Sequence, residues 1–298
     1  MNATQRPFRI PVVAALGPGS QEEDEQLDYM SMPSGMETYR PPLLPEPEAL
    51  AGHALAREVL AAVLEAVTTA CQGGRPAPIR LDGLPPEELA LVNQVLGEGE
   101  VGAQVLARPE TRQFGDDAVR VRVQESVFAG VWRVVAIDDD GALRDRIEVG
   151  AIPAVLLDAA REDASAPRVP PQPLPDGLVN VPSLLFELAE QRARWAPGHD
   201  AHVVNLTLLP LVADDIAHID HQLGTGRVLI LSRGYGNCRI SNTLAENTWR
   251  LVYYNSQDKV ILNAIEVSAV PEVACAAAED LADTQQRLGE VLQWVMQP

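Results

Sequence analysis

The chain has 298 residues, and 46% of them are hydrophobic, which is enough for two domains of ordinary size. Its formal net charge is −19, from 42 acidic and 23 basic residues. A surface this acidic repels phosphate backbones and anionic lipid, so neither nucleic acid nor a membrane is expected as a partner.

The cysteine content predicts a cytoplasmic protein. Cys71, Cys238 and Cys275 form no CxxC pair, so the sequence contains neither a disulfide framework nor a zinc motif. Unpaired thiols are typical of a reducing compartment. The apolar run Ile10–Leu16 follows two arginines but is too short for a signal peptide, and no apolar segment reaches the ~20 residues that a membrane helix needs.

Residues 1–48 are predicted to form an extended or disordered acidic tail. Five acidic residues lie between Gln21 and Asp28, and prolines recur from Pro33 to Pro47. No helical or strand periodicity is present there, and the charges favour a solvated segment. Its tyrosines and methionines are unusual for a spacer, so we expect the tail to dock onto its own domain or onto a partner.

Residues 49–161 are predicted to form a first unit that begins with a helix at Ala54–Ala70. A short strand near Ile79 and a helix that starts at Pro85-Pro86 and is closed by Gly97 come next. Alternating apolar and polar residues then predict four antiparallel strands, at Val101–Leu106, Ala118–Ser126, Val131–Ile137 and Arg146–Ile152. A helix at Ala154–Arg161 closes the unit. Residues 162–177 contain five prolines and are predicted to be a semi-rigid linker.

Residues 178–298 are predicted to form a second unit with the same plan. The expected helices are Pro182–Trp195, Asp214–Leu223 and Ala276–Val295. The expected strands are Val203–Leu208, Val228–Leu231, a strand from Cys238 to Thr243, Trp249–Tyr254 and Val260–Val267.

An internal repeat relates the two units. Leu96-Gly97-x-Gly99-x-Val101 reappears 127 residues later as Leu223-Gly224-x-Gly226-x-Val228, and Trp132-Arg133 matches Trp249-Arg250. The glycines follow helices rather than strands, which argues against a dinucleotide-binding fingerprint. The predicted class is therefore α+β, with two tandem pseudo-repeated units, each an antiparallel sheet with flanking helices. Whether the two sheets stay separate or join is left open.

The segment Leu223–Asn255 is the most distinctive part of the chain. Its Gly-rich turn predicts a surface recognition loop made of Arg233, Gly234, Tyr235, Gly236, Asn237, Cys238 and Arg239. Tryptophan next to arginine is typical of binding hot spots, so the predicted partner-binding surface also includes Trp249, Arg250, Phe128, Trp132 and Arg133. The simpler alternative is a β-meander with a tight turn, in which the tryptophans belong to the core.

No catalytic machinery can be assembled from the sequence. Asp214, His218 and His221 form one stripe of a helix with metal-site spacing, but they lie on its predicted polar face. Cys238 is either a half-buried strand residue or a reactive thiol, used by a metal or iron–sulfur carrier together with these histidines or by a thiol-dependent enzyme. We predict no catalytic residues, no resident metal and no cofactor.

Three blocks carry a family resemblance, namely LGTGRVLILSRGYGNCRIS, TWRLVYYNS and ILNAIEVSAVPEVACAAAED. The chain closely resembles the HupH/HyaF/HoxQ family of [NiFe]-hydrogenase expression and formation proteins, and the resemblance extends to the acidic tail and to the first unit. It implies a cytoplasmic assembly chaperone for the iron–sulfur small subunit of an uptake hydrogenase before twin-arginine export. The resemblance brings no defined catalytic residues.

Overall fold

The computed structural model describes residues 52–108, 119–138, 140–165, 178, 180–234 and 236–295. The predicted tail, Tyr235 and most of the predicted linker lie outside these residues. The elements of the first unit are α2 (Ala54–Cys71), β1 (Ile79–Arg80), α3 (Pro86–Leu96), β2 (Val101–Leu106), β3 (Val119–Glu125), β4 (Val131–Ile137), β5 (Leu143–Val149) and α4 (Ala154–Ser165). Those of the second unit are α5 (Val181–Arg194), β6 (His202–Asn205), the 3₁₀-helix η2 (Leu206–Leu208), α6 (Ala213–Leu223), β7 (Val228–Ser232), β8 (Asn237–Asn242), β9 (Thr248–Tyr254), β10 (Val260–Val267), the 3₁₀-helix η3 (Glu272–Ala274) and α7 (Ala278–Val295).

All ten of these strands belong to one antiparallel sheet, in the order β1-β5-β4-β3-β2-β7-β8-β9-β10-β6. The two predicted sheets are therefore joined, and the join is the pairing of β2 with β7, in which Ala103 lies opposite Ile230. From this pair outward, each side consists of four consecutive strands of one unit, followed by the short strand that precedes them in sequence. The strand order is the same on both sides.

One face of the sheet carries a central core shared by both units. Strand alternation turns Val101, Ala103 and Val105 of β2 and Val228 and Ile230 of β7 toward this core. Trp132, Trp249, Cys238 and Leu156 of α4 belong to the same cluster. The central strands thus contribute apolar side chains from both halves, so neither half encloses this core alone.

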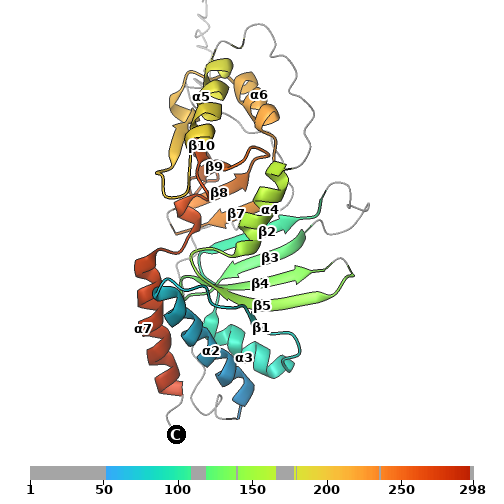
Figure 1. The fold of residues 1–298 in the computed structure, drawn as a ribbon, viewed down its shortest axis with the longest axis vertical. Coiled ribbons are helices and arrows are strands. Elements are labelled where there is room, and N and C mark those ends of the chain that lie inside the picture. Colours follow the sequence, from blue (N-terminus) through green and yellow to red (C-terminus); the bar gives the residue numbers. More distant parts are fainter. Residues whose placement is uncertain are drawn as a thin grey trace, which may run out of the picture.

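The helices on the opposite face are divided between the two ends of the molecule (Figure 1). At one end α2 and α3 cover Val131 and Ile147, and at the other end α5 and α6 cover Ile265 and Val267. Helix α7 crosses between the units. It follows β10 in sequence but packs against α2, where Gln285 Nε2 donates to Thr68 Oγ1 at 3.0 Å.

Helices α3 and α6 end as the sequence predicts. The residue after each is a glycine with positive φ, 57° at Gly97 and 68° at Gly224, and its N–H donates to a carbonyl of the last turn. A Cβ built on Gly224 would lie 2.7 Å from the Leu244 side chain. Glycine is therefore required there both by backbone conformation and by space.

The predicted strand boundaries at Val101–Leu106, Val131–Ile137 and Val260–Val267 are confirmed. The boundary predicted for the strand Arg146–Ile152 was wrong, since β5 spans Leu143–Val149. Pairing with β4 already begins at Leu143, which lies opposite Ile137. Just after the end of the strand, the Gly150 carbonyl accepts the Trp132 indole N–H at 2.8 Å.

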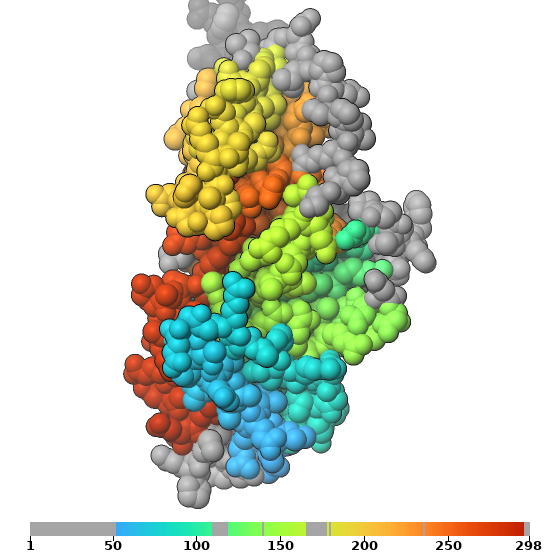
Figure 2. Space-filling view, viewed as in Figure 1, coloured from blue at the N-terminus to red at the C-terminus, as the bar shows by residue number. Residues whose placement is uncertain are grey.

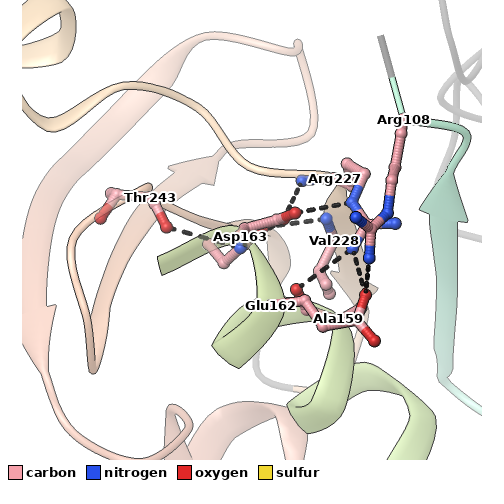
Figure 3. Close-up of polar contacts among 8 residues, drawn as sticks. Arg108, Ala159, Glu162, Asp163, Arg227, Val228 and Thr243 are labelled. Atoms are coloured by element: carbon pink, nitrogen blue, oxygen red, sulfur yellow. Dashed lines mark hydrogen bonds and ion pairs between the residues drawn. The ribbon is translucent and has the colours of Figure 1, made fainter. Parts of the chain in front are cut away.

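Helix α4 runs to Ser165 and so extends four residues into the predicted linker. The reason is an anchor at its C-terminal end, where Asp163 accepts two bonds from Arg227, at 2.7 Å from the backbone N–H and 2.6 Å from Nε. Asn242 donates a third bond to Asp163, at 3.0 Å. Figure 3 shows Arg227 and Arg108 next to each other on one side of α4, where both reach Glu162. Helix α4 of the first unit is thereby tied to the second unit.

We predict that Asp163→Ala lowers the free energy of unfolding by ~3 kcal/mol, measured by urea denaturation. The substitution removes the acceptor of the Arg227 backbone N–H and Nε and the shorter of the two bonds that the buried Asn242 amide donates. Glu162 still pairs with the Arg227 guanidinium, but removing one partner of a buried ion pair is strongly destabilising. Asp158→Ala on the same helix is the matched control. Asp158 is exposed and, among the described residues, pairs with exposed Arg161, so its loss is expected to cost less than ~1 kcal/mol. Equal effects of the two substitutions would contradict the anchor.

Candidate partner-binding site

The predicted recognition loop is the turn between β7 and β8. Arg233, Gly234 and Gly236 are exposed, and Asn237 is half-buried. The Arg233 N–H donates to the Glu100 carbonyl at 3.1 Å, which attaches the turn to the first unit. A Cβ on Gly234 would lie 2.3 Å from the Glu100 carboxylate, so glycine is what allows this close approach. Arg233 and the two glycines are thus on the surface, as the sequence predicts, whereas Cys238 of the same predicted loop is buried.

Arg239 extends from β8 on the face opposite the central core. Its guanidinium lies over the Tyr254 ring, 5.2 Å from the ring centroid, and also donates a hydrogen bond to the Tyr254 hydroxyl. Both contacts fix the orientation of a half-buried arginine next to the exposed turn. An ordered cation beside a surface loop is suited to recognition.

Cys238 faces the opposite way, into the central core, and is 2% exposed. Burial raises the pKa of its thiol to about 11, although a hydrogen bond with Tyr253 acts in the other direction. A thiol with this pKa is protonated near neutral pH and is a poor nucleophile. Among the described residues, no histidine is hydrogen-bonded to it. These features favour the half-buried strand interpretation over the reactive thiol.

Three of the aromatic members of the predicted surface lie in the core. Trp132, Trp249 and Phe128 are 1%, 2% and 3% exposed, respectively. The indole N–H groups donate to the carbonyls of Gly150 and Ala269, at 2.8 and 3.3 Å. In this conformation, therefore, the three side chains are not presented to a partner. A tryptophan next to an arginine occurs both in surface hot spots and in strands that bury every second residue, so the sequence alone does not distinguish the two.

The neighbouring arginines attach helices to the sheet. Arg133 forms an ion pair with Asp145 at 2.6 Å and donates to Asn93 of α3 at 2.8 Å. Arg250 makes the corresponding contact with Asp220 of α6, at 3.4 Å. Each arginine thus holds the second helix of its own unit against the sheet, a structural role that accounts for its place beside tryptophan.

In the predicted histidine stripe on α6, His218 contacts its own helix. His218 Nδ1 lies 2.8 Å from the Asp214 carbonyl of its own helix. Over the described ranges, no group of three or more His, Cys, Asp or Glu side chains is arranged for a metal. The described residues include Cys238, His218 and His221, so these three are not arranged as such a group.

A cavity of about 480 Å³ lies beside the turn that precedes β9. Its walls come from α4, from the segment after α5, and from the turn itself, and they include Leu157, Ala160, Ala164, Trp195, Pro197 and Asn247. In Figure 2 the orange atoms of the second unit lie between yellow α5 and lime α4. This cavity could not be predicted from the sequence because segments far apart in the chain build it. One available signal was Asn247, which stands where the repeat has Gly130.

Glu125 is buried at the end of β3, in the position that Asn242 has in the second unit. Burial raises the pKa of its carboxyl from 4.5 to about 7, and the nearby carboxylates of Glu100 and Asp280 act in the same direction. The Gly130 N–H donates to it at 3.1 Å and partly opposes this shift.

Comparison with known proteins places this chain in a family. The model described as "HupH hydrogenase expression protein, C-terminal conserved region" matches twice, at residues 54–169 and 178–295. The chain belongs to the HupH family. Nowhere in the described residues is there a helix long and apolar enough to cross a membrane.

Relatives within the HupH family align over nearly the whole chain. The hydrogenase expression/formation protein HoxQ of Cupriavidus necator is 52% identical, over 97% of this chain and 98% of its own length. HupH of Rhodobacter capsulatus is 45% identical over 96% and 98%, and the hydrogenase-1 operon protein HyaF of Escherichia coli is 30% identical over 94% and 95%. A solved structure of HupH from Thiobacillus denitrificans is 29% identical, covers 38% of this chain and 93% of its own, and has a TM-score of 0.35.

We predict that Cys71 is alkylated first and that Cys238 and Cys275 react much more slowly in the folded protein. Cys71 is exposed, whereas burial raises the pKa values of the other two thiols to about 11 and about 12. Iodoacetamide labelling followed by mass spectrometry gives the three rates. A Cys238 rate at or above that of Cys71 would revive the thiol-enzyme alternative.

We predict that Glu125→Gln flattens the pH dependence of stability. The folded-state pKa is raised, so the stabilisation is present below about pH 4.5 and is lost as pH rises through about 7. Between about pH 5 and about pH 8 the free energy of unfolding of the wild type should fall by about 2 to 3 kcal/mol relative to that of the variant. Urea unfolding at each pH measures this difference. Exposed Glu290→Gln is the control and should behave as the wild type. Parallel curves for Glu125→Gln and the wild type would refute the assignment.

Proposed function

We propose that this protein is a hydrogenase maturation factor that acts as a non-catalytic assembly chaperone in the cytoplasm. Its client would be the precursor of the iron–sulfur small subunit of an uptake [NiFe] hydrogenase, held before twin-arginine export, with other maturation proteins as further partners. The observation that carries the proposal is full-length similarity to proteins named for hydrogenase expression and formation.

The proposal includes a duplicated architecture in which two copies of one module form a single body. Support comes from the strand order, which is the same on both sides of the β2–β7 pair, and from the family model, which matches each half. Such a body offers a long rigid sheet with exposed turns at its surface, which suits binding of another polypeptide.

The proposed contact surface centres on the turn from Arg233 to Arg239, including Gly234, Tyr235, Gly236 and Asn237. Arg233 and the two glycines are exposed, and Arg239 is held against Tyr254. The buried members of the predicted surface are best regarded as support for this turn and its sheet. The carrier and thiol-enzyme alternatives are not favoured, because the Cys238 thiol is buried and protonated.

Charge supports the choice of client. The chain has a net charge of −19, and a twin-arginine leader is basic, so long-range attraction would speed their encounter. Exposed charges more than about 10 Å apart are screened at ordinary salt, so this attraction depends on ionic strength.

We predict that tagged full-length protein from hydrogenase-producing cells retains the small-subunit precursor, identified by mass spectrometry. The amount retained should fall several-fold when the wash is raised from about 50 mM to about 500 mM NaCl, because screening removes the attraction. Retention that is unchanged by salt would remove electrostatics as the main contribution to binding. Failure to recover the precursor at either salt concentration would refute the proposed client.

A further inference from the structure

The turns that precede β4 and β9, Ser126–Val131 and Thr243–Thr248, have the same hydrogen bonds. In each, the N–H of the first residue donates to the carbonyl of the last, at 2.8 and 3.0 Å. The hydroxyl of the first residue also accepts from the N–H two residues later, at 3.1 and 3.0 Å. We call them the first turn and the second turn, and their backbones are equivalent.

Both turns place their fifth residue at positive φ, 78° for Gly130 and 50° for Asn247. At the first turn glycine is needed for space, since a Cβ there would lie 2.4 Å from Leu281 of α7. The second turn has a side chain at this position, and Asn247 lines the cavity. The two turns therefore differ in what lies against them.

Helix α7 covers the first turn. Leu281 packs on Gly130, the Thr284 hydroxyl donates to the Ala129 carbonyl at 3.0 Å, and Arg287 lies 5.5 Å from the centroid of the Phe128 ring. Leu288, one turn further along, is fully buried in the same cluster as Phe128. An amphipathic helix with leucine, hydroxyl and arginine side chains thus binds this kind of turn.

The second turn has no such cover within the part of the chain that is described. Helix α4 passes beside it but presents the small side chains Ala160 and Ala164, and the cavity remains between α4 and Trp195. The Trp195 indole nitrogen is shielded from water and has no acceptor among the described residues.

The geometry points to this cavity as the seat of a helical segment of the client polypeptide, with an apolar side chain of leucine size and a lysine or arginine beside it. The apolar walls and the arrangement at the first turn favour the leucine-sized side chain. Of the two charged residues that line the cavity, Arg161 is already paired with Asp158 at 2.9 Å, so exposed Glu246 attracts a cation. This inference rests on the proposed function for the identity of the client.

A photocrosslinker tests the occupant directly. Ala164→p-benzoylphenylalanine places the probe in the cavity wall of the full-length protein, produced in hydrogenase-expressing cells. Ala282→p-benzoylphenylalanine is the matched control. Pro153 and Pro271 are 118 residues apart, and the same offset relates Ala164 to exposed Ala282 of α7. We expect the residue-164 probe to give an adduct with the small-subunit precursor, at least ~fivefold above the residue-282 probe.

Adducts at 164 only with a second copy of this chain, or only within the same chain, would overturn the inference by identifying another occupant. Equal yields at 164 and 282 would also overturn it. Co-purification with the unmodified protein separates failure of the cavity assignment from failure of the proposed function. If the precursor is retained but is not crosslinked at 164, the cavity assignment alone fails, and if it is not retained, the proposed function fails with it.

A second variant does not depend on how the probe affects folding. Glu246→Lys reverses the charge at the cavity mouth on an exposed side chain and should reduce retained precursor ~fivefold. Glu290→Lys, exposed on α7, changes the net charge equally and should leave retention within ~1.5-fold of the wild type. Equal losses in both variants would mean that net charge alone, and not this cavity, governs binding.

Discussion

The antiparallel pairing of β2 with β7 is the contact on which the rest of the molecule depends. It joins five strands of one unit to five of the other, with Ala103 opposite Ile230. Counted outward from this pair, the strands of the two units follow the same order. Because the pairing also aligns the apolar faces of both halves, the central core is shared and neither half would enclose it alone. The crossing helices strengthen this joint, since α4 is anchored to Arg227 and α7 packs on α2.

The most informative part of the structure is where the two halves differ. Gly130 and Asn247 occupy equivalent positions, but Leu281 lies against the first and a cavity lies beside the second. Glu125 and Asn242 also correspond, and only Asn242 receives a helix anchor, through Asp163. Among the described residues, α7 thus closes the first turn while a cavity remains beside the second, and this difference is the basis for the binding place that we propose.

Much of the fold could be predicted from the sequence, because strand periodicity and helix-ending glycines are local signals. Val101–Leu106 alternates apolar and polar positions, and Gly97 and Gly224 stop their helices at positive φ. The length of α4 could not be predicted in this way, because its last turn is held by Arg227, 64 residues away. The joining of two sheets into one is likewise a tertiary choice that periodicity does not encode.

The candidate site was predictable only in part. The exposed turn at Arg233 follows from its glycines, whereas Trp132 and Trp249 are core residues because strand alternation turns both toward the shared face. The cavity draws its walls from α4, Trp195 and the turn before β9, and no single stretch of sequence reveals such a meeting.

Hydrogen–deuterium exchange, measured with and without the purified small-subunit precursor, tests the central claim most directly. That claim is that the protein binds its client through the second unit, at the exposed turn before β8 and the cavity beside the turn before β9. The account predicts slowed exchange in the Arg233–Arg239 and Thr243–Thr248 turns, with α2 and α7 unchanged. Slowed exchange confined to α2 and α7, or no change anywhere in the protein, would contradict it.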